Sequence, residues 1–310
     1  MIDTKKALQA LSQNLAQVMF GKEEALNLSM IALLGRGHLL IEDVPGVGKT
    51  FLARGLAQSI GGEFKRLQCT PDLLPGDITG VSIFDQRTHT FEFMRGPVFC
   101  NVLLADEINR APPRAQSALL ECMGEHQVTV DGHTHRLPPV YMVIATQNPL
   151  EFQGTYALPE AQLDRFFMRI KLGYPDTAAE LKMIASQQHG HPLDRVGPVI
   201  ELEELESLQR AVEDVRVSDD VASYALTIVQ ATRNHPGLSL GASPRATLAL
   251  LRAAQAFALI RGEDFITPRH IKQIARPVLS HRVIARSGTN AAQAADTLIG
   301  EILGSVSIPV

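Results

Sequence analysis

The sequence has few cysteines and no excess of positive charge. Its 310 residues include only Cys69, Cys100 and Cys122, an odd number without metal-ligand spacing. This pattern favours a reducing cytosol over a disulfide framework. The formal net charge is −4 and the pI is about 6.2, so the chain as a whole does not attract nucleic acid. Any contact with DNA would need a local basic patch, and nucleic acid is not the expected partner.

Long hydrophobic runs are also absent. The longest apolar stretch, residues 30–40, is interrupted by Gly35, Arg36 and Gly37, which leaves it far too short to span a membrane. Polar residues interleave residues 1–15, so no signal peptide is expected there. We therefore expect a soluble cytoplasmic protein without membrane insertion.

Apolar runs separated by helical stretches predict an α/β fold in the first half of the chain. The expected strands are residues 38–41, 63–68, 98–105 and 139–146. Helical periodicity between several of them is typical of a parallel sheet with crossover helices. After residue 175 the sequence is expected to be helical, at 179–188, 202–212, 219–231, 245–260 and 268–279. The length is sufficient for two domains, here a core at 1–175 and a smaller helical domain at 176–310.

Two segments interrupt the predicted core. Residues 69–97 contain many Pro and Gly, which indicates an insertion, with a short hairpin around residues 91–93. Residues 113–126 have the spacing of an amphipathic helix. The alternating residues after it end in Asp131-Gly132, which predicts a second hairpin at about 128–137.

Residues 43–50 read DVPGVGKT and follow the apolar run 38–41. A buried strand that leads through a Gly-rich loop to Gly-Lys-Thr and a helix is the layout of a phosphate-binding loop. Converging backbone N–H groups and the helix dipole favour an anion there. Lys49 adds a mobile positive charge, and Thr50 offers a hydroxyl group to Mg²⁺. The expected nucleotide contacts in this loop are Pro45, Gly46, Val47, Gly48, Lys49, Thr50 and Phe51.

Asp43 departs from the general pattern, which has Gly six residues before the Lys. Asp tolerates left-handed backbone geometry better than most residues, so the turn can form. Its carboxylate is expected to point away from the phosphates, because like charges repel.

Polar side chains follow two of the predicted strands. Asp106 and Glu107 end a strand that is apolar on both faces, at the end where open α/β sheets bind ligands. Asp106 would hold Mg²⁺ through water, and Glu107 would activate the attacking water. Asn148 ends the next strand, where it would hold that water or contact the terminal phosphate. An acidic turn and an ordinary Asn-Pro turn are the alternatives.

Two arginines are further candidates. Arg165 follows Asp164 and precedes the last apolar strand of the core. It forms either an ion pair with Asp164 or Glu160, or an arginine finger that reaches a neighbouring subunit's nucleotide. Arg245 follows Ser243-Pro244, so it lies in the first turn of a helix, where an anionic partner would offset the unfavourable dipole.

Together these motifs, in this order, resemble those of the AAA+ ATPases. The similarity is most specific over residues 103–113 (LLADEINRAPP), 116–120 (QSALL), 145–149 (ATQNP), 158–166 (LPEAQLDRF) and 241–246 (GASPRA), which resemble the MoxR subgroup. The resemblance covers nearly the whole chain from Val18 onward.

The resemblance implies a role for each matching residue. Lys49 and Thr50 match the Walker A Lys and Thr, Asp106 and Glu107 match Walker B, and Asn148 matches sensor 1. Arg165 matches the arginine finger and Arg245 the sensor 2 arginine. The adenine-side segment of the family matches residues 18–21, which include Val18, Phe20 and Gly21. Residues 69–97 match the insertion in helix 2, and the C-terminal helical domain matches the lid.

The resemblance also implies an ATPase that needs ATP and Mg²⁺ and forms a homo-oligomer, a hexameric ring. Such proteins are thought to remodel, mature or activate protein clients, often with partners that carry von Willebrand factor A domains. The alternative of another class is a nucleic-acid motor of the ring helicase type, because both predicted hairpins resemble ones that helicases use on DNA. A non-catalytic adaptor is a third hypothesis, against which Glu107 and Arg165 argue.

Overall fold

The computed structural model describes residues 3–149, 154–187, 190, 192–286 and 291–309. It contains two compact units, each assembled from separate stretches of the chain. The first unit comprises residues 1–27, 38–158 and 171–206, and the second comprises residues 28–37, 159–170 and 207–310. A domain boundary at about residue 175 stays a prediction.

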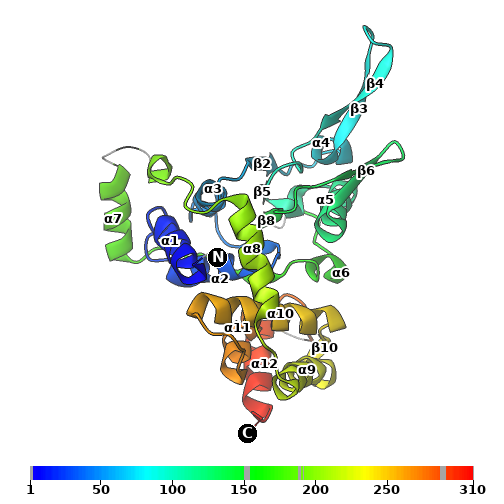
Figure 1. The fold of residues 1–310 in the computed structure, drawn as a ribbon. Coiled ribbons are helices and arrows are strands. Elements are labelled where there is room, and N and C mark those ends of the chain that lie inside the picture. Colours follow the sequence, from blue (N-terminus) through cyan, green and yellow to red (C-terminus); the bar gives the residue numbers. More distant parts are fainter. Residues whose placement is uncertain (1–2, 150–153, 188–189, 191, 287–290, 310) are drawn as a thin grey trace. The chain divides into compact units, whose positions relative to one another are not determined.

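The structure has helices and strands in the alternating order that the sequence indicates (Figure 1). The helices are α1 (Thr4–Ala16), α2 (Glu23–Leu34), α3 (Lys49–Ser59), α4 (Pro75–Thr79), α5 (Pro113–Glu125), α6 (Glu160–Leu163), α7 (Thr177–Gln187), α8 (Leu202–Asp214), α9 (Asp219–Asn234), α10 (Pro244–Arg261), α11 (Pro268–Leu279) and α12 (Ala291–Ser305), with short 3₁₀ turns at Ile108–Arg110 and Pro192–Arg195. The strands are β1 (Leu39–Glu42), β2 (Phe64–Gln68), β3 (Gly80–Asp85), β4 (Thr90–Arg95), β5 (Val102–Asp106), β6 (Gln127–Val130), β7 (His133–Arg136), β8 (Met142–Gln147), β9 (Met168–Ile170), β10 (Leu238–Leu240) and β11 (Ile284–Ala285).

A five-stranded sheet with the order β2-β5-β8-β1-β9 forms the centre of the α/β fold. The pairs β2–β5, β5–β8 and β1–β8 are parallel. Residues 102–105 of β5 and 142–146 of β8 are fully buried, as expected for strands that helices cover on both faces. The α/β fold with a parallel sheet that the apolar runs predict is thereby confirmed.

Two antiparallel hairpins interrupt this fold. Strands β3 and β4 form the first, which projects away from the sheet in Figure 1, and α4 precedes it. Strands β6 and β7 form the second, with Asp131 and Gly132 both at positive φ in its turn. A two-residue turn of this kind matches the right-handed twist of the strands, which explains the Asp-Gly pair.

The C-terminal region is mainly helical, in accordance with the prediction, but it is not free of strands. Strands β10 and β11 form a two-stranded antiparallel sheet there. Strands of two or three residues are too short to produce a periodic pattern, so the sequence did not reveal them. Helix α12 was also not predicted from the sequence.

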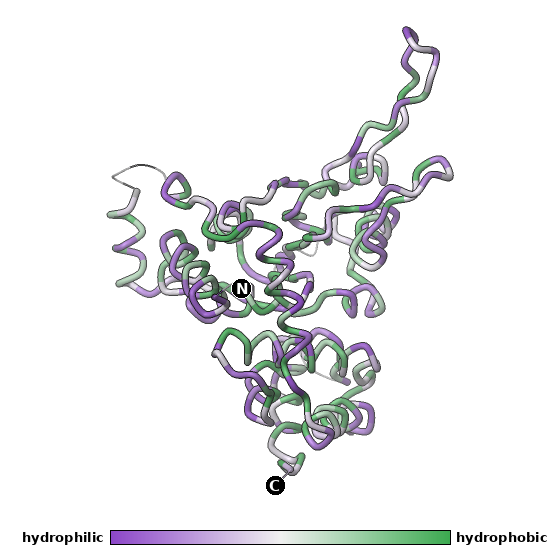
Figure 2. Tube along the Cα trace, viewed as in Figure 1, coloured by the Kyte–Doolittle hydropathy of each residue, from purple (hydrophilic) through white to green (hydrophobic). Residues whose placement is uncertain are grey.

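Along α8, hydrophobic and hydrophilic residues alternate in the way typical of a helix with one buried face (Figure 2). Within the described ranges, no helix combines the length and hydropathy that a membrane span requires.

His38 joins three elements of the first unit. Its ring is only 4% exposed, Nε2 lies 3.1 Å from the carbonyl oxygen of Met123, and Nδ1 accepts a 3.0 Å hydrogen bond from the backbone N–H of Val143. Because Nδ1 accepts, the ring is neutral and its proton resides on Nε2. Burial lowers the pKa of His38 to about 4, with a smaller contribution in the same direction from His126.

The lowered pKa of His38 predicts a loss of stability in acid. The unfolded chain binds a proton near pH 6.5, whereas the folded chain does so only near pH 4. The stabilisation is complete above pH 6.5 and decreases as the pH falls toward 4, by at most about 3 kcal/mol. Chemical denaturation at several pH values should show a shallower pH dependence for His38→Leu than for the parent. Parallel profiles for the two proteins would contradict this role of His38.

Candidate nucleotide-binding site

The phosphate loop connects the end of β1 to the start of α3. Gly46 and Gly48 have φ values of 85° and 99°, a region in which side chains are strained. No atom lies within 4 Å of a Cβ placed on Gly46, so this glycine is required for its backbone conformation rather than for close packing. Gly48 precedes the first turn of α3, which begins at Lys49. The free N–H groups of that turn favour an anion at this end of the helix.

Asp43 has a structural role in this loop. One carboxylate oxygen accepts hydrogen bonds from the backbone N–H groups of Leu172 (2.7 Å) and Gly173 (2.6 Å), and the other accepts from Val44 (2.8 Å). Backbone N–H groups thus bind both oxygens of the Asp43 carboxylate. This agrees with the expectation, based on charge repulsion, that the carboxylate points away from the phosphates. Asp43 is not among the described residues with positive φ, so the turn forms without left-handed geometry at this position. No glycine is needed at this position.

Thr146 aligns the acidic pair at the end of β5. This residue of β8 is only 1% exposed, and its hydroxyl donates to Asp106 Oδ1 at 2.6 Å. The same hydroxyl oxygen accepts from the backbone N–H of Glu107 at 2.9 Å. The other oxygen of Asp106 lies 2.7 Å from the guanidinium of Arg66 on β2.

Glu107 has an unusual backbone conformation. Its φ and ψ are 56° and 52°, which is rare for a residue with a long side chain and is often found at functional sites. Arg110 lies 3.0 Å from its Oε2 atom, and the Gln68 amide donates to that same oxygen at 3.3 Å. The carboxylate is therefore held from two sides at the end of the strand.

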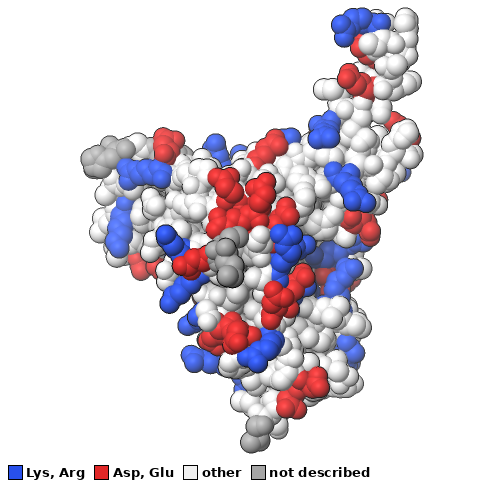
Figure 3. All heavy atoms as spheres, in the orientation of Figure 1, with Lys and Arg blue, Asp and Glu red and all other residues white. Residues whose placement is uncertain are grey.

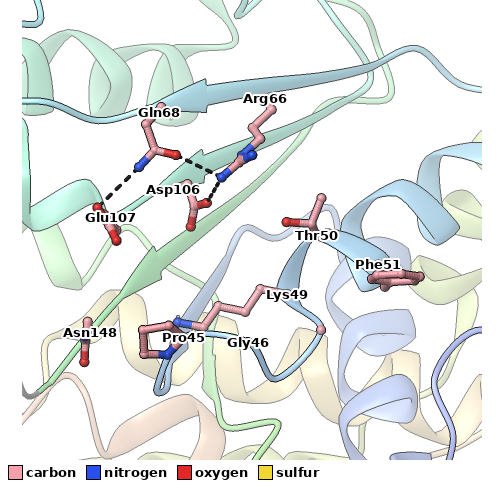
Figure 4. Close-up of a pocket in the computed structure, with 11 residues that line it drawn as sticks. Pro45, Gly46, Lys49, Thr50, Phe51, Arg66, Gln68, Asp106, Glu107 and Asn148 are labelled. Atoms are coloured by element: carbon pink, nitrogen blue, oxygen red, sulfur yellow. Dashed lines mark hydrogen bonds and ion pairs between the residues drawn. The ribbon is translucent and has the colours of Figure 1, made fainter. Parts of the chain in front are cut away.

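Asp106 and Glu107, with Arg66 and Gln68, line a pocket of about 380 Å³ (Figure 4). Its lining residues come from the phosphate loop, the start of α3 and the ends of β2, β5 and β8: Pro45, Gly46, Gly48, Lys49, Thr50, Phe51, Arg66, Gln68, Asp106, Glu107 and Asn148. In Figure 4, Lys49 and Thr50 lie on one side of this space, and Asp106 and Glu107 lie on the other. Cationic, hydroxyl and carboxylate groups thus meet at the carboxyl edge of the sheet.

A second pocket of about 390 Å³ adjoins the phosphate loop on its other side. Gly46, Gly48 and Phe51 line both pockets. Mostly apolar side chains complete the second one, among them Val18, Met19, Phe20, Val47 and Ala179. Gly21 follows this segment with a φ of 67°, although it does not line the pocket. A charged pocket beside an apolar one fits a ligand that combines phosphates with a flat base.

The structure does not bring every candidate into this site. Arg165 and Arg245 belong to the second unit, and their proposed contacts with nucleotide stay predictions. Conversely, the sequence did not predict that four other residues contact the acidic pair or line its pocket: Arg66, Gln68, Arg110 and Thr146. A polar Thr directly after the apolar residues 142–145 of this strand was a usable signal, because a buried hydroxyl requires a hydrogen-bond partner. Arg66 and Gln68 gave no signal, since alternating polar residues are ordinary for an edge strand.

The donor atoms suit a magnesium nucleotide. Thr50 and Asp106 supply a hydroxyl and a carboxylate oxygen, the hard ligands that Mg²⁺ prefers. Among the described residues there is no group of three or more His, Cys, Asp or Glu that could hold a metal by itself. Mg²⁺ usually keeps several waters and binds through one or two side chains together with substrate phosphates, so Thr50 and a water-mediated contact from Asp106 are sufficient.

Comparison with known proteins agrees with this geometry. Residues 38–168 match the ATPase family associated with various cellular activities (AAA), and residues 230–302 match the AAA lid domain. The uncharacterized protein YeaC of Bacillus subtilis is 48% identical over 299 residues, which cover 96% of this chain and 93% of that protein. Chaperone MoxR1 of Mycobacterium tuberculosis is 38% identical, covering 94% of this chain and 80% of that protein. The crystal structure of a candidate ATPase from Cytophaga hutchinsonii superimposes with a TM-score of 0.90 and 35% identity, covering 99% of this chain and 96% of that one.

A phosphate loop beside a strand-end acidic pair, followed by a helical lid, defines the class of AAA ATPases. Within that class, the chain belongs to the MoxR family.

The hydrogen bonds that the Asp43 carboxylate accepts from backbone N–H groups predict that this side chain stabilises the fold. Asp43→Ala would leave the backbone N–H groups of Leu172 and Gly173 without their acceptor, so we expect unfolding to require about 2–4 kcal/mol less. Urea denaturation measures this difference. Asp85→Ala is the matched control, because Asp85 is only partly buried and accepts one backbone N–H in an exposed hydrogen bond (from Arg87, 2.8 Å), so its loss should be much smaller. Equal stability of Asp43→Ala and the parent would contradict the assignment.

Proposed function

We propose that the protein hydrolyses ATP with Mg²⁺ and uses the energy to remodel a protein client as a homo-oligomeric ring. The observation that carries this proposal is the convergence of Lys49, Asp106, Glu107 and Asn148 on a single pocket. A module that only bound nucleotide would not need a carboxylate aligned beside the metal ligand.

The residues of the pocket would bind different parts of the magnesium nucleotide. Backbone N–H groups at the start of α3 and the Lys49 ammonium would hold the β- and γ-phosphates. Thr50 and Asp106 would hold Mg²⁺, which when bound neutralises charge on the phosphate oxygens. Pocket residues beside Phe51 and Val18 would receive the adenine.

Glu107 is the proposed general base. Its carboxylate would orient and activate the water that attacks the terminal phosphate, and Asn148 would hold the same water. The bonds from Arg110 and Gln68 limit the orientations of the Glu107 side chain. Arg165 is the proposed arginine finger acting on a neighbouring subunit, and Arg245 the proposed second sensor of the nucleotide.

The chaperone-like role rests on relatives and on an exposed surface. MoxR1 of M. tuberculosis is named a chaperone. The β3–β4 hairpin of this chain exposes large apolar side chains, with Phe91 73% and Met94 55% exposed, which suit contact with a client. In Figure 3, acidic and basic side chains lie close together on this hairpin, whereas a nucleic-acid surface would be uniformly basic. A hexamer and a partner with a von Willebrand factor A domain are further parts of the proposal.

Removing the base should separate binding from turnover. We expect Glu107→Gln to bind ATP with nearly parental affinity and to lose about 10²–10⁴-fold in kcat, because Gln cannot accept the proton of the water. Lys49→Ala should instead lose binding. A thermal-shift titration with ATP and a phosphate-release assay measure the two properties. Turnover by Glu107→Gln at the parental rate would refute the assignment of the base.

A mixing experiment tests whether the site is shared between subunits. Arg165→Ala and Glu107→Gln should each be inactive alone. Mixed one to one, they should regain activity, because about a quarter of the interfaces would combine an intact Glu107 with an intact Arg165. Steady-state ATPase assays after subunit exchange measure this gain. A mixture as inactive as its components, although the subunits demonstrably exchange, would count against a finger acting in trans.

A further inference from the structure

Arg282, a buried arginine of the second unit, donates hydrogen bonds to the backbone carbonyl groups of Asp164 and Phe166, the residues on either side of Arg165. The side chain of Arg282 is only 2% exposed, and its Nε lies 3.1 Å from Asp164 Oδ1 at ion-pair distance. Its terminal nitrogens donate to the carbonyl oxygens of Phe166 (2.6 Å) and Val278 (2.8 Å). The guanidinium therefore ties the segment around Arg165 to helix α11.

The second oxygen of the same carboxylate receives a bond from another element. The Ser243 hydroxyl donates to Asp164 Oδ2 at 2.9 Å. Ser243 occupies the N-cap position of α10, immediately before Pro244 and Arg245, but its side chain makes no capping hydrogen bond. The Ser243 hydroxyl is thus bonded to Asp164 and not to the backbone of its own helix.

The start of α11 offers a natural comparison. Thr267-Pro268-Arg269 repeats the Ser-Pro-Arg arrangement. There the backbone N–H of Thr267 donates to Nδ1 of His270 at 3.1 Å, within its own helix. A helix of this kind can therefore begin with local bonds, so the diversion of Ser243 to Asp164 is not required for helix formation.

The charges of this cluster are compatible with a fixed geometry. Burial lowers the pKa of Arg282 to about 10, and the nearby Asp164 carboxylate opposes that change. Arg282 therefore remains charged near pH 7. The charge of Arg245 also lowers the pKa of Arg282, which places Arg245 in the same electrostatic neighbourhood.

We infer that Ser243 is a positioning residue for Arg245. Its hydrogen bond to Asp164 connects the start of α10 to the segment that carries Arg165, and the ion pair with Arg282 holds Asp164 in place. A shift of the first turn of α10 is then transmitted to the residue next to Arg165. This inference rests on the proposed roles of Arg165 and Arg245 in ATP hydrolysis.

A double-mutant cycle on Ser243 and Arg245 tests the inference. Ser243→Ala leaves the ion pair between Asp164 and the buried Arg282 intact, so the variant should fold. We expect it to lower kcat/KM for ATP by about 3- to 10-fold, which is typical of coupled neighbours. In the Arg245→Ala background the same substitution should change kcat/KM by less than about 2-fold, because the side chain that it positions is missing.

Two controls separate positioning from a loss of stability. Ser243→Thr keeps the hydroxyl and should retain nearly the parental kcat and KM. Thr267→Ala changes the equivalent position of α11 and should leave both constants within about 2-fold of the parent. Denaturation midpoints of Ser243→Ala and Thr267→Ala should be similar, although only the first lowers kcat/KM.

The outcomes distinguish this inference from the proposed function. A parental ATPase rate for Arg245→Ala would refute the role of Arg245 and the inference with it. An impaired Arg245→Ala together with a parental Ser243→Ala would overturn the inference alone. An effect of Ser243→Ala that is equally large in both backgrounds would also overturn it, because Ser243 would then act independently of Arg245.

Discussion

The register of the parallel strands is the constraint on which the site depends. Strand β8 pairs with β1 on one side and β5 on the other, so that Ile144 is aligned with both Leu39 and Leu104. This alignment places the ends of the three strands, with the phosphate loop, the acidic pair and Asn148, along one edge. A slip of one residue would turn Thr146 to the opposite face of the sheet and remove its bonds to Asp106 and Glu107.

Carboxylates with several hydrogen-bond or ion-pair partners organise backbone segments in both units. Asp43 accepts three backbone N–H groups, and Asp164 joins Ser243 to the buried Arg282. In each case all the carboxylate's partners are nearby donors or cations, which compensates the cost of burying the charge. Neither residue needs to touch a nucleotide to influence the site. Asp43 shapes the phosphate loop, while Asp164 lies directly before the proposed arginine finger.

Much of the fold could be predicted because its signals are local. Apolar runs indicated β1, β2, β5 and β8, and the Asp-Gly pair indicated the turn between β6 and β7. The short strands β10 and β11 and the helix α12 were missed. The pairing of β10 with β11 joins residues more than forty positions apart and leaves no periodic pattern in the sequence. The hydrogen bonds of Asp43 with Leu172 and Gly173 could not be predicted either, because these partners lie 129 and 130 positions away along the chain.

The sequence by itself determined the phosphate loop, the strand-end Asp-Glu pair and the order of the motifs, because these depend on neighbours along the chain. Only the tertiary structure decided which side chains meet. Arg66 reaches Asp106 across forty positions, and Arg282 reaches Asp164 across 118. Strand register and helix packing set such contacts, and many residues far apart in the sequence determine both. The chemistry of the site is therefore visible in short motifs, whereas the groups that hold it in place become visible only in the folded chain.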